Sequence, residues 1–379
     1  MLPSKLPTVG TTIFTVMSQL AAEVGALNLS QGFPNFPTDP ALIELVTKAM
    51  HEGHNQYAPM PGVLALREAI AQKTSALYGA SYRPDDEVTI TAGATEALFA
   101  AITAVVRPGD EVLVFEPAYD AYVPAIELAG GVPVYVSLTP PDYAIDWARV
   151  RSLVTDRTRL IVVNTPHNPT GRVWTADDLD HLTALVRDHG LFVVADEVYE
   201  HILFDGRAHH SLAGHAELRE RTFVVGSFGK TFHITGWKIG YCLAPKSLTT
   251  EFRKVHQFLA FSVSTPMQHA LAAYLSQPER YLSLPSFYER KRDLFLAALA
   301  GSRFTYTPTE GSFFQNVSYA AITDEPDHEL AVRLTRELGV ASIPVSVFYH
   351  HRADYKVLRF CFAKDDETLL RAGERLRAL

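Results

Sequence analysis

The chain has 379 residues, of which 47% are apolar and 20% charged, a composition typical of a soluble globular protein with one large domain or two unequal ones. Its net charge of −8 argues against a nucleic-acid-binding surface and against a polybasic membrane anchor. The N-terminus lacks the apolar core of a signal peptide, and no apolar run approaches the ~18 residues of a membrane-spanning helix, so we expect a cytoplasmic protein. The two cysteines, Cys242 and Cys361, have no metal-like spacing, and we expect both to be free thiols in the core.

The first 40 residues are rich in proline and glycine and only weakly periodic, which predicts an irregular arm. From about residue 41, helical patterns alternate with short apolar runs. The clearest helical patterns cover residues 41–53, 63–79 and 95–106. Within the last of these, residues 97–106 form the longest apolar stretch of the chain, so we expect a buried helix there.

Six continuously apolar runs predict strands, at residues 87–93, 111–117, 132–138, 159–166, 191–197 and 222–228. Because these runs do not alternate with polar residues, we expect a mostly parallel α/β sheet that helices cover on both faces. After about residue 275 a long helical stretch, a strand at 357–363 and a charged final helix predict a smaller α+β domain. We therefore predict a large domain of residues 41–275 and a small domain of residues 1–40 together with 276–379.

Polar residues follow several predicted strands, where sheets of this kind bind ligands. Ala94 and Thr95 open a helix whose free N–H groups suit a phosphate, although a plain tight turn would have the same sequence. Asp196 ends a strongly apolar strand, where a carboxylate needs a cationic partner if it is buried; a helix cap or a surface acid is equally compatible. Asn168 lies in the turn-rich loop NTPHNPTG and could bond to a ligand or to its own backbone.

Residues 226–240 read GSFGKTFHITGWKIG and hold two lysines, Lys230 and Lys238, with no acidic residue. This pattern calls for a buried anion or for covalent chemistry of an amine. The stretch is not a Walker A loop, because Val224 stands where that motif needs glycine. Nor do the S-D-N or K-T-G motifs of penicillin-binding enzymes follow the S-x-x-K that begins at Ser227. A lysine for a Schiff base, a buried carboxylate for a protonated ring nitrogen and a phosphate cradle are together the requirements of pyridoxal phosphate.

Two further features concern charge on apolar strands and adjacent histidines. Arg359 lies alone on its predicted strand, which suits bidentate capture of a carboxylate, although an exposed arginine on an edge strand would look the same.

Two pairs of adjacent histidines occur, at residues 209–210 and 350–351. Neighbouring side chains point apart, so we expect these histidines to be poor chelators on the surface.

Six motifs in one order carry a resemblance that covers nearly the whole chain. They are SQGFPNFPTDP, NQYAPMPGVLALREAI, TAGATEAL, NTPHNPTG, DEVYEH and SFGKTFHITGWKIGY. Together they resemble the pyridoxal-phosphate-dependent aminotransferases of the aspartate aminotransferase fold family (fold type I), and most closely its methionine and kynurenine aminotransferase branch. The resemblance implies that fold, the cofactor, amino-group transfer from an amino acid to a 2-oxo acid by a ping-pong mechanism, and a homodimer with active sites at the subunit interface.

The resemblance also implies a role for each matching cofactor position. Lys230 matches the Schiff-base lysine, Asp196 the acid that pairs with the pyridine nitrogen, and Tyr199 a donor to the phenolic oxygen; these three are the implied catalytic residues. Tyr119 matches the aromatic residue stacked on the cofactor ring. The remaining implied contacts are Asn168 at the phenolic oxygen, Ala94, Thr95, Ser227 and Lys238 at the phosphate, and Tyr57 reaching the phosphate from the partner subunit. Lys238 replaces the commoner arginine, which is normal in this branch.

On the substrate side, Arg359 matches the arginine that grips the substrate α-carboxylate with help from Asn168, and Gly32 and Phe14 match lining positions. Relatives that use dicarboxylates place a partner-subunit arginine near the stretch 255–268, which here has no lysine or arginine. The resemblance therefore predicts a large apolar or aromatic donor, methionine first and then phenylalanine, tyrosine, leucine or kynurenine.

Two other functions remain compatible with this scaffold. A pyridoxal-phosphate-dependent carbon–sulfur β-lyase would use the same lysine and aspartate, so the sequence leaves that reaction open. A non-enzymatic regulator with this fold would carry an added basic DNA-binding domain, and we expect none here.

Overall fold

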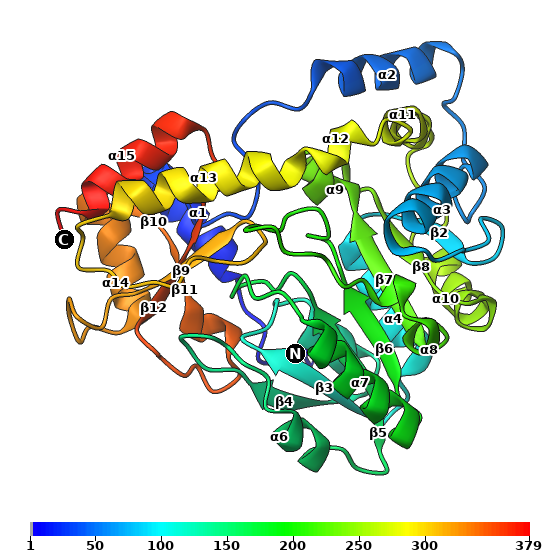
Figure 1. The fold of residues 1–379 in the computed structure, drawn as a ribbon, viewed down its shortest axis with the longest axis horizontal. Coiled ribbons are helices and arrows are strands. Elements are labelled where there is room, and N and C mark those ends of the chain that lie inside the picture. Colours follow the sequence, from blue (N-terminus) through cyan, green and yellow to red (C-terminus); the bar gives the residue numbers. More distant parts are fainter. Residues whose placement is uncertain (1–2) are drawn as a thin grey trace.

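The computed structural model describes residues 3–379 of the chain (Figure 1). The α-helices are α1 (Ile13–Val24), α2 (Pro40–His51), α3 (Leu64–Tyr78), α4 (Ala94–Val105), α5 (Tyr122–Leu128), α6 (Trp147–Ser152), α7 (Ala176–His189), α8 (Ala216–Arg219), α9 (Phe228–Thr231), α10 (Lys246–Leu259), α11 (Thr265–Leu275), α12 (Glu279–Leu282), α13 (Leu284–Leu299), α14 (Asp327–Arg333) and α15 (Asp366–Leu376). Short 3₁₀ or π turns are η1 (Leu212–Gly214), η2 (Thr235–Trp237), η3 (Leu334–Leu338) and η4 (Val345–Phe348).

A seven-stranded sheet forms the centre of the larger part of the chain, in the order β2-β8-β7-β6-β5-β3-β4. Its strands are β2 (Val88–Thr91), β3 (Glu111–Glu116), β4 (Val132–Ser137), β5 (Thr158–Asn164), β6 (Phe192–Asp196), β7 (Thr222–Ser227) and β8 (Gly240–Leu243). Strand β8 runs in the direction opposite to the other six, since it pairs antiparallel with both β2 and β7. The six predicted strands and the mostly parallel sheet are confirmed. The sequence did not predict β8, because four residues after a glycine-rich turn are too short for a recognisable pattern.

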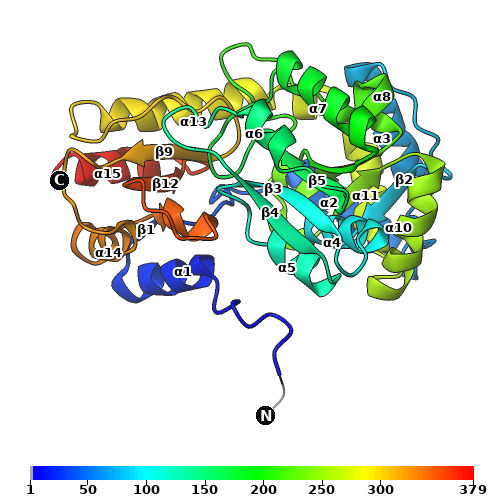
Figure 2. The ribbon, with the colours of Figure 1, turned by 90° about the horizontal axis from the view of Figure 1, so that it is seen from below.

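Helices cover both faces of this sheet, which explains why its strands are continuously apolar. In β3, Val112 and Val114 pack in a core shared with α4, α5 and α10, whereas Leu113 and Phe115 pack in the core on the other face. Figure 2 shows α4 and α5 on the side of the sheet opposite to α6 and α7. The apolar stretch 97–106 is buried in α4 as predicted, and both cysteines are buried and free.

The first 40 residues are more regular than predicted. Helix α1 begins at Ile13, where the Thr12 side chain accepts a hydrogen bond from the Thr15 N–H, and it ends at Gly25, whose φ of 66° suits glycine. Its buried residues, Met17, Leu20 and Ala21, form a narrow apolar stripe. The prediction of an irregular arm was therefore wrong for this segment, because a stripe of three residues gives a weak periodic signal.

The smaller part of the chain contains a three-stranded antiparallel sheet, β11-β12-β9, and a two-stranded parallel pair, β1-β10. These strands are β1 (Leu27–Asn28), β9 (Phe314–Ser318), β10 (Val340–Ala341), β11 (Ile343–Pro344) and β12 (Val357–Cys361). The pairing of Leu27 with Val340, and the hydrogen bond from the Cys361 N–H to the Leu29 carbonyl, join the N-terminal segment to the C-terminal part. These contacts support the proposed small domain of residues 1–40 and 276–379. Between residues 3 and 379 no helix combines the length and apolar character needed to cross a membrane.

Candidate active site

One cavity lies where the carboxyl ends of β5, β6 and β7 meet the N-terminus of α4. Most of the residues predicted to contact the cofactor line it, although they come from segments far apart in the chain. They are Ala94, Thr95, Tyr119, Asn168, Asp196, Tyr199, Ser227, Lys230 and Lys238. The parallel sheet explains this convergence, because its strands end at one edge.

Asp196 lies at the end of β6 and is 4% exposed. Its Oδ2 accepts a hydrogen bond from the Tyr122 hydroxyl at 2.6 Å, and its Oδ1 accepts one from the Val198 N–H at 3.3 Å. Desolvation raises the pKa of Asp196 from 3.8 to about 6, and these two hydrogen bonds oppose that rise. The carboxylate is thus costly to keep ionised unless a positive group approaches it, as a protonated ring nitrogen would.

Sequence reasoning missed Tyr122, which lies 74 positions before Asp196. This residue starts α5, is 2% exposed and stacks edge-to-face with Tyr119, three positions earlier. The segment FEPAYDAY contains both tyrosines, three positions apart. This spacing, about one helical turn, is the only sequence signal that could have linked Tyr122 to the predicted cofactor contact Tyr119. Tyr122 fixes the orientation of the Asp196 carboxylate from outside the cavity.

Lys230 lies in the short helix α9, and part of its side chain is exposed to the cavity. Its Nζ donates a hydrogen bond to the Gly32 carbonyl at 2.9 Å. Desolvation, with smaller contributions from the cations of Lys238 and Arg359, lowers the pKa of Lys230 from 10.5 to about 8. An amine with this pKa is partly neutral near pH 7 and can act both as a nucleophile and as a base.

The end of the cavity at α4 suits an anion. Gly93 precedes the helix with φ 78°, and no side chain within residues 3–379 caps its first turn, so the N–H groups at Ala94 and Thr95 remain available. A Cβ atom at Gly93 would lie 3.1 Å from Cε and 3.2 Å from Nζ of Lys238, so glycine leaves room for that cation. Ser227, at the end of β7, lines the same end.

Arg359 lies beside this cavity on β12 and is 1% exposed. Its Nη1 donates to Asn168 Oδ1 at 2.8 Å and its Nη2 donates to the Ser30 carbonyl at 3.1 Å. Its buried Nε has no hydrogen-bond partner among residues 3–379. Desolvation lowers the pKa of Arg359 to about 10, so the guanidinium stays charged at neutral pH. A buried cation with an unpaired donor fits a carboxylate ligand.

Aromatic rings surround the guanidinium of Arg359. Its Cζ lies 3.9 Å from the ring centroid of Phe314, 5.1 Å from that of Phe348 and 5.3 Å from that of Phe14. A Cβ atom at Gly32 would lie 2.6 Å from Cζ of Phe314, so only glycine lets this loop approach the ring. Gly32 and Phe14 therefore lie close to Phe314 and Arg359, and their role in lining the donor pocket stays a prediction; Phe348 is an aromatic neighbour that the sequence did not reveal.

Tyr57 does not line the cavity of its own chain. The residue is 82% exposed, and its ring lies 5.5 Å from that of Phe261, which is 47% exposed. Phe258, at 87%, is also exposed. An outward-facing tyrosine is compatible with the predicted contact in a partner subunit, which stays a prediction.

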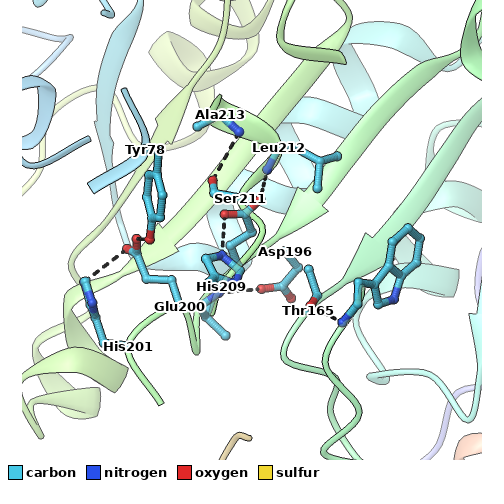
Figure 3. Close-up of polar contacts among 12 residues, drawn as sticks. Tyr78, Thr165, Asp196, Glu200, His201, His209, Ser211, Leu212 and Ala213 are labelled. Atoms are coloured by element: carbon cyan, nitrogen blue, oxygen red, sulfur yellow. Dashed lines mark hydrogen bonds and ion pairs between the residues drawn. The ribbon is translucent and has the colours of Figure 1, made fainter. Parts of the chain in front are cut away.

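Figure 3 shows a second polar cluster near Asp196, which includes Tyr78, Glu200 and His201. Glu200 Oε1 lies 2.5 Å from Lys73 Nζ, an ion pair whose side chains are 6% and 3% exposed. Tyr78 donates to the other carboxylate oxygen at 2.7 Å. Desolvation raises the pKa of Glu200, but the charge of Lys73 and hydrogen bonds to the carboxylate outweigh this, so the pKa lies below its ordinary value.

The structure corrects the prediction of a surface position for His209, whereas His350 and His351 are exposed as predicted. The His209 side chain is only 4% exposed, and its Nε2 lies 2.8 Å from Glu197 Oε2. The His350 side chain is 27% exposed, and its Nδ1 lies 2.9 Å from a carboxylate oxygen of Glu116. Both are therefore structural partners of buried carboxylates, which sequence separation conceals.

The residues of the cavity fit pyridoxal phosphate. A buried aspartate that forms no ion pair within residues 3–379, a lysine with a lowered pKa, and a helix N-terminus beside a second lysine match its ring nitrogen, its aldehyde and its phosphate.

Comparison with known proteins establishes the family. A family model described as aminotransferase class I and II matches residues 24–376. The chain belongs to this family. This aminotransferase is 53% identical over 377 residues to methionine aminotransferase from Escherichia coli strain K12, with 99% of this chain and 98% of the relative covered. It is 37% identical over 388 residues to a probable N-succinyldiaminopimelate aminotransferase from Mycobacterium tuberculosis, with 99% and 98% covered.

Solved structures agree with this assignment. The crystal structure of YbdL from Escherichia coli, described as having a methionine aminotransferase function, matches with a TM-score of 0.98 at 53% identity and complete coverage of both chains. A double mutant of Thermus thermophilus aspartate aminotransferase matches with a TM-score of 0.91 at 32% identity, covering 100% of this chain and 99% of the other. The chain is therefore a pyridoxal-phosphate-dependent aminotransferase with the α/β fold predicted, and its relatives favour this reaction over a carbon–sulfur β-lyase.

Proposed function

We propose that this aminotransferase uses methionine and other large apolar or aromatic amino acids as donors and passes the amino group to a 2-oxo acid by a ping-pong mechanism. The observation that carries this proposal is that aromatic rings surround the Arg359 guanidinium. The guanidinium can bind the α-carboxylate of the donor, and the rings can contact its apolar side chain. The 53% identity to a methionine aminotransferase supports it. The absence of lysine and arginine from residues 255–268 argues against a second carboxylate.

Each cavity residue is proposed to hold a particular part of the cofactor. Lys230 would hold the aldehyde, and Asp196 the ring nitrogen. Tyr199 and Asn168 would face the phenolic oxygen, and Tyr119 would stack on the ring. The phosphate would contact Ala94, Thr95, Ser227 and Lys238, where a helix N-terminus and a cation lie together. The resemblance implies these roles, and the lining of one cavity by all of these side chains supports them.

When bound, pyridoxal phosphate supplies an electron sink that makes the α-proton of an attached amino acid removable. Asp196, when ionised, keeps the ring nitrogen protonated and so preserves that sink. Lys230 is suited to move the α-proton, because desolvation lowers its pKa to about 8. Arg359 and Asn168 orient the donor by its carboxylate, which holds the α-carbon toward the amine.

We also propose that the protein is a homodimer in which Tyr57 reaches the phosphate of the partner subunit. The exposed rings of Tyr57 and Phe261, which lie 5.5 Å apart, support this, because exposed apolar side chains that gather in one place mark interaction surfaces; Phe258, near the end of α10, is exposed as well. In a dimer, Phe258 and Phe261 would add apolar area to the partner's donor pocket. Gly32 and Phe14 would line the same pocket from the subunit that holds the cofactor.

The test is a donor panel measured on the cofactor-loaded protein. Mixing with methionine alone, without a 2-oxo acid, should remove the visible absorbance of the lysine-linked cofactor in one half-reaction, and Lys230→Ala should abolish turnover. In steady state, kcat/KM for methionine and phenylalanine should exceed that for aspartate by at least about tenfold. A pocket of this kind separates donors that differ by one methylene by only ~1–3 kcal/mol, so breadth is expected. A preference for aspartate would overturn the proposal.

A further inference from the structure

Residues 56–63 and 256–268, two segments that lie far apart in the sequence, are joined by hydrogen bonds into one lobe that exposes Tyr57, Phe258 and Phe261. Side chains of the second segment bind the backbone of the first. The contacts are Thr265 Oγ1 to the Gln56 carbonyl (2.5 Å), Ser262 Oγ to the Ala58 carbonyl (3.0 Å), His256 Nε2 to the Met60 carbonyl (3.0 Å) and the Val63 N–H to Gln268 Oε1 (2.7 Å). The lobe carries Tyr57, Phe258 and Phe261, the residues proposed to serve the partner's active site.

His256 also connects this lobe to the active site of its own chain. The residue is 0% exposed, and its Nδ1 lies 3.0 Å from Glu96 Oε1. Glu96 lies in the first turn of α4, and its Oε2 accepts a hydrogen bond from the Ala92 N–H at 3.0 Å. A continuous path of hydrogen bonds therefore runs from the turn before α4, at the phosphate end of the cavity, through His256 to Met60.

The chemistry of the two partners defines how His256 is protonated. The Met60 carbonyl can only accept, so Nε2 must carry a hydrogen. Nδ1 faces a carboxylate oxygen, so one further proton is held between Nδ1 and Glu96, whichever atom carries it. The two ring nitrogens of His256 thus bond to two different segments, α4 through Glu96 and residues 56–63 through Met60. Such a pair of hydrogen bonds fixes the position of one segment relative to the other.

We propose that His256 is a positioning residue that couples the two active sites of the homodimer, by holding the lobe that serves the partner in register with the phosphate-binding end of its own α4. The proposal rests on the proposed dimer, in which the lobe contributes Tyr57 to the partner's site. Substitution of His256 in one subunit therefore acts in trans, on the cofactor that the other subunit holds.

Hybrid dimers with differently tagged subunits provide the test. One subunit carries Lys230→Ala together with the test substitution, so that only the other, otherwise unmodified subunit holds a lysine-linked cofactor. With His256→Leu in the first subunit, loss of the lysine-linked cofactor into cofactor-free buffer should become about tenfold faster, as expected when one hydrogen bond to a charged group is lost. The rate is followed by visible absorbance and compared with a hybrid that carries Lys230→Ala alone.

Three further hybrids decide the outcome. His269→Leu is the matched control, because His269 lies on α11 and stacks on His54, just after α2, with ring centroids 3.7 Å apart, so it is outside the path toward α4; it should leave the rate unchanged. Tyr57→Phe should accelerate release in trans. Glu96→Gln should do the same as His256→Leu, and it replaces that variant if His256→Leu does not fold.

The result separates this inference from the proposed dimer. If Tyr57→Phe acts in trans but neither His256→Leu nor Glu96→Gln does, the coupling through His256 is refuted while the dimer stands. If Tyr57→Phe has no effect in trans, or if sedimentation shows a monomer, the proposed dimer arrangement itself fails.

Discussion

Replacement of Tyr122 by phenylalanine should change the pH range in which the protein binds its cofactor. The Tyr122 hydroxyl donates to Asp196 at 2.6 Å and opposes the rise that desolvation causes in the pKa of Asp196, which is about 6. A hydrogen bond to a charged group contributes ~1.5–3 kcal/mol, and 1.36 kcal/mol corresponds to one pH unit. Tyr122→Phe should therefore raise the pKa of Asp196 by about one to two pH units.

The assay is the affinity of the cofactor-free protein for pyridoxal phosphate, titrated between about pH 5 and pH 9. Because the ring nitrogen pairs with the ionised carboxylate, affinity should fall as the pH drops through the pKa of Asp196. The midpoint of this fall should move upward by the same one to two pH units in the variant, with similar affinities at the alkaline end. Tyr288→Phe is the matched control, since the Tyr288 hydroxyl is buried and has no hydrogen-bond partner within residues 3–379. Equal midpoints for Tyr122→Phe and the parent protein would refute the reasoning.

Two other substitutions test the remaining charged groups. Arg359→Lys should raise KM for amino-acid donors by about 10-fold to 100-fold and lower kcat less. The reason is that an ammonium lacks the planar pair of N–H donors with which a guanidinium can bond Asn168 and a carboxylate at the same time. Steady-state kinetics that leave KM unchanged would contradict this. Lys73→Met should lower the free energy of unfolding of the cofactor-free protein by ~3–5 kcal/mol, because it leaves the Glu200 carboxylate buried without its cation, and the double variant Lys73→Met/Glu200→Gln should recover most of that loss. Urea unfolding measures both, and equal losses in the single and double variants would argue that the ion pair has no such role.

Local patterns were enough to predict most of the elements that build the site. The runs that end at Asp196 and Ser227 are continuously apolar because helices cover both faces of the sheet, so they could be recognised as strands without any tertiary information. Helix α1 and strand β8 escaped prediction, because one buries a stripe of only three residues and the other has only four residues.

The family motifs identified residues that line the cavity, but not the residues outside it that bond to them or to the elements that carry them. Asp196 and Lys230 stand out because a charge at the end of an apolar strand, or in an apolar stretch without acids, needs a chemical reason. Tyr122, His256 and Glu200 do not stand out, because each is an ordinary residue in its own segment.

The sequence by itself determined most of the strands and helices along the chain and the motifs that indicate the family and its cofactor, because these depend on residues close together in the chain. Only the tertiary structure decided which groups hold those residues in place. The bond from Tyr122 to Asp196 spans 74 positions, that from Arg359 to Asn168 spans 191, and that from His256 to Glu96 spans 160. No local pattern encodes such contacts, since they form only when the sheet brings the ends of its strands to one edge and the small part of the chain closes beside it.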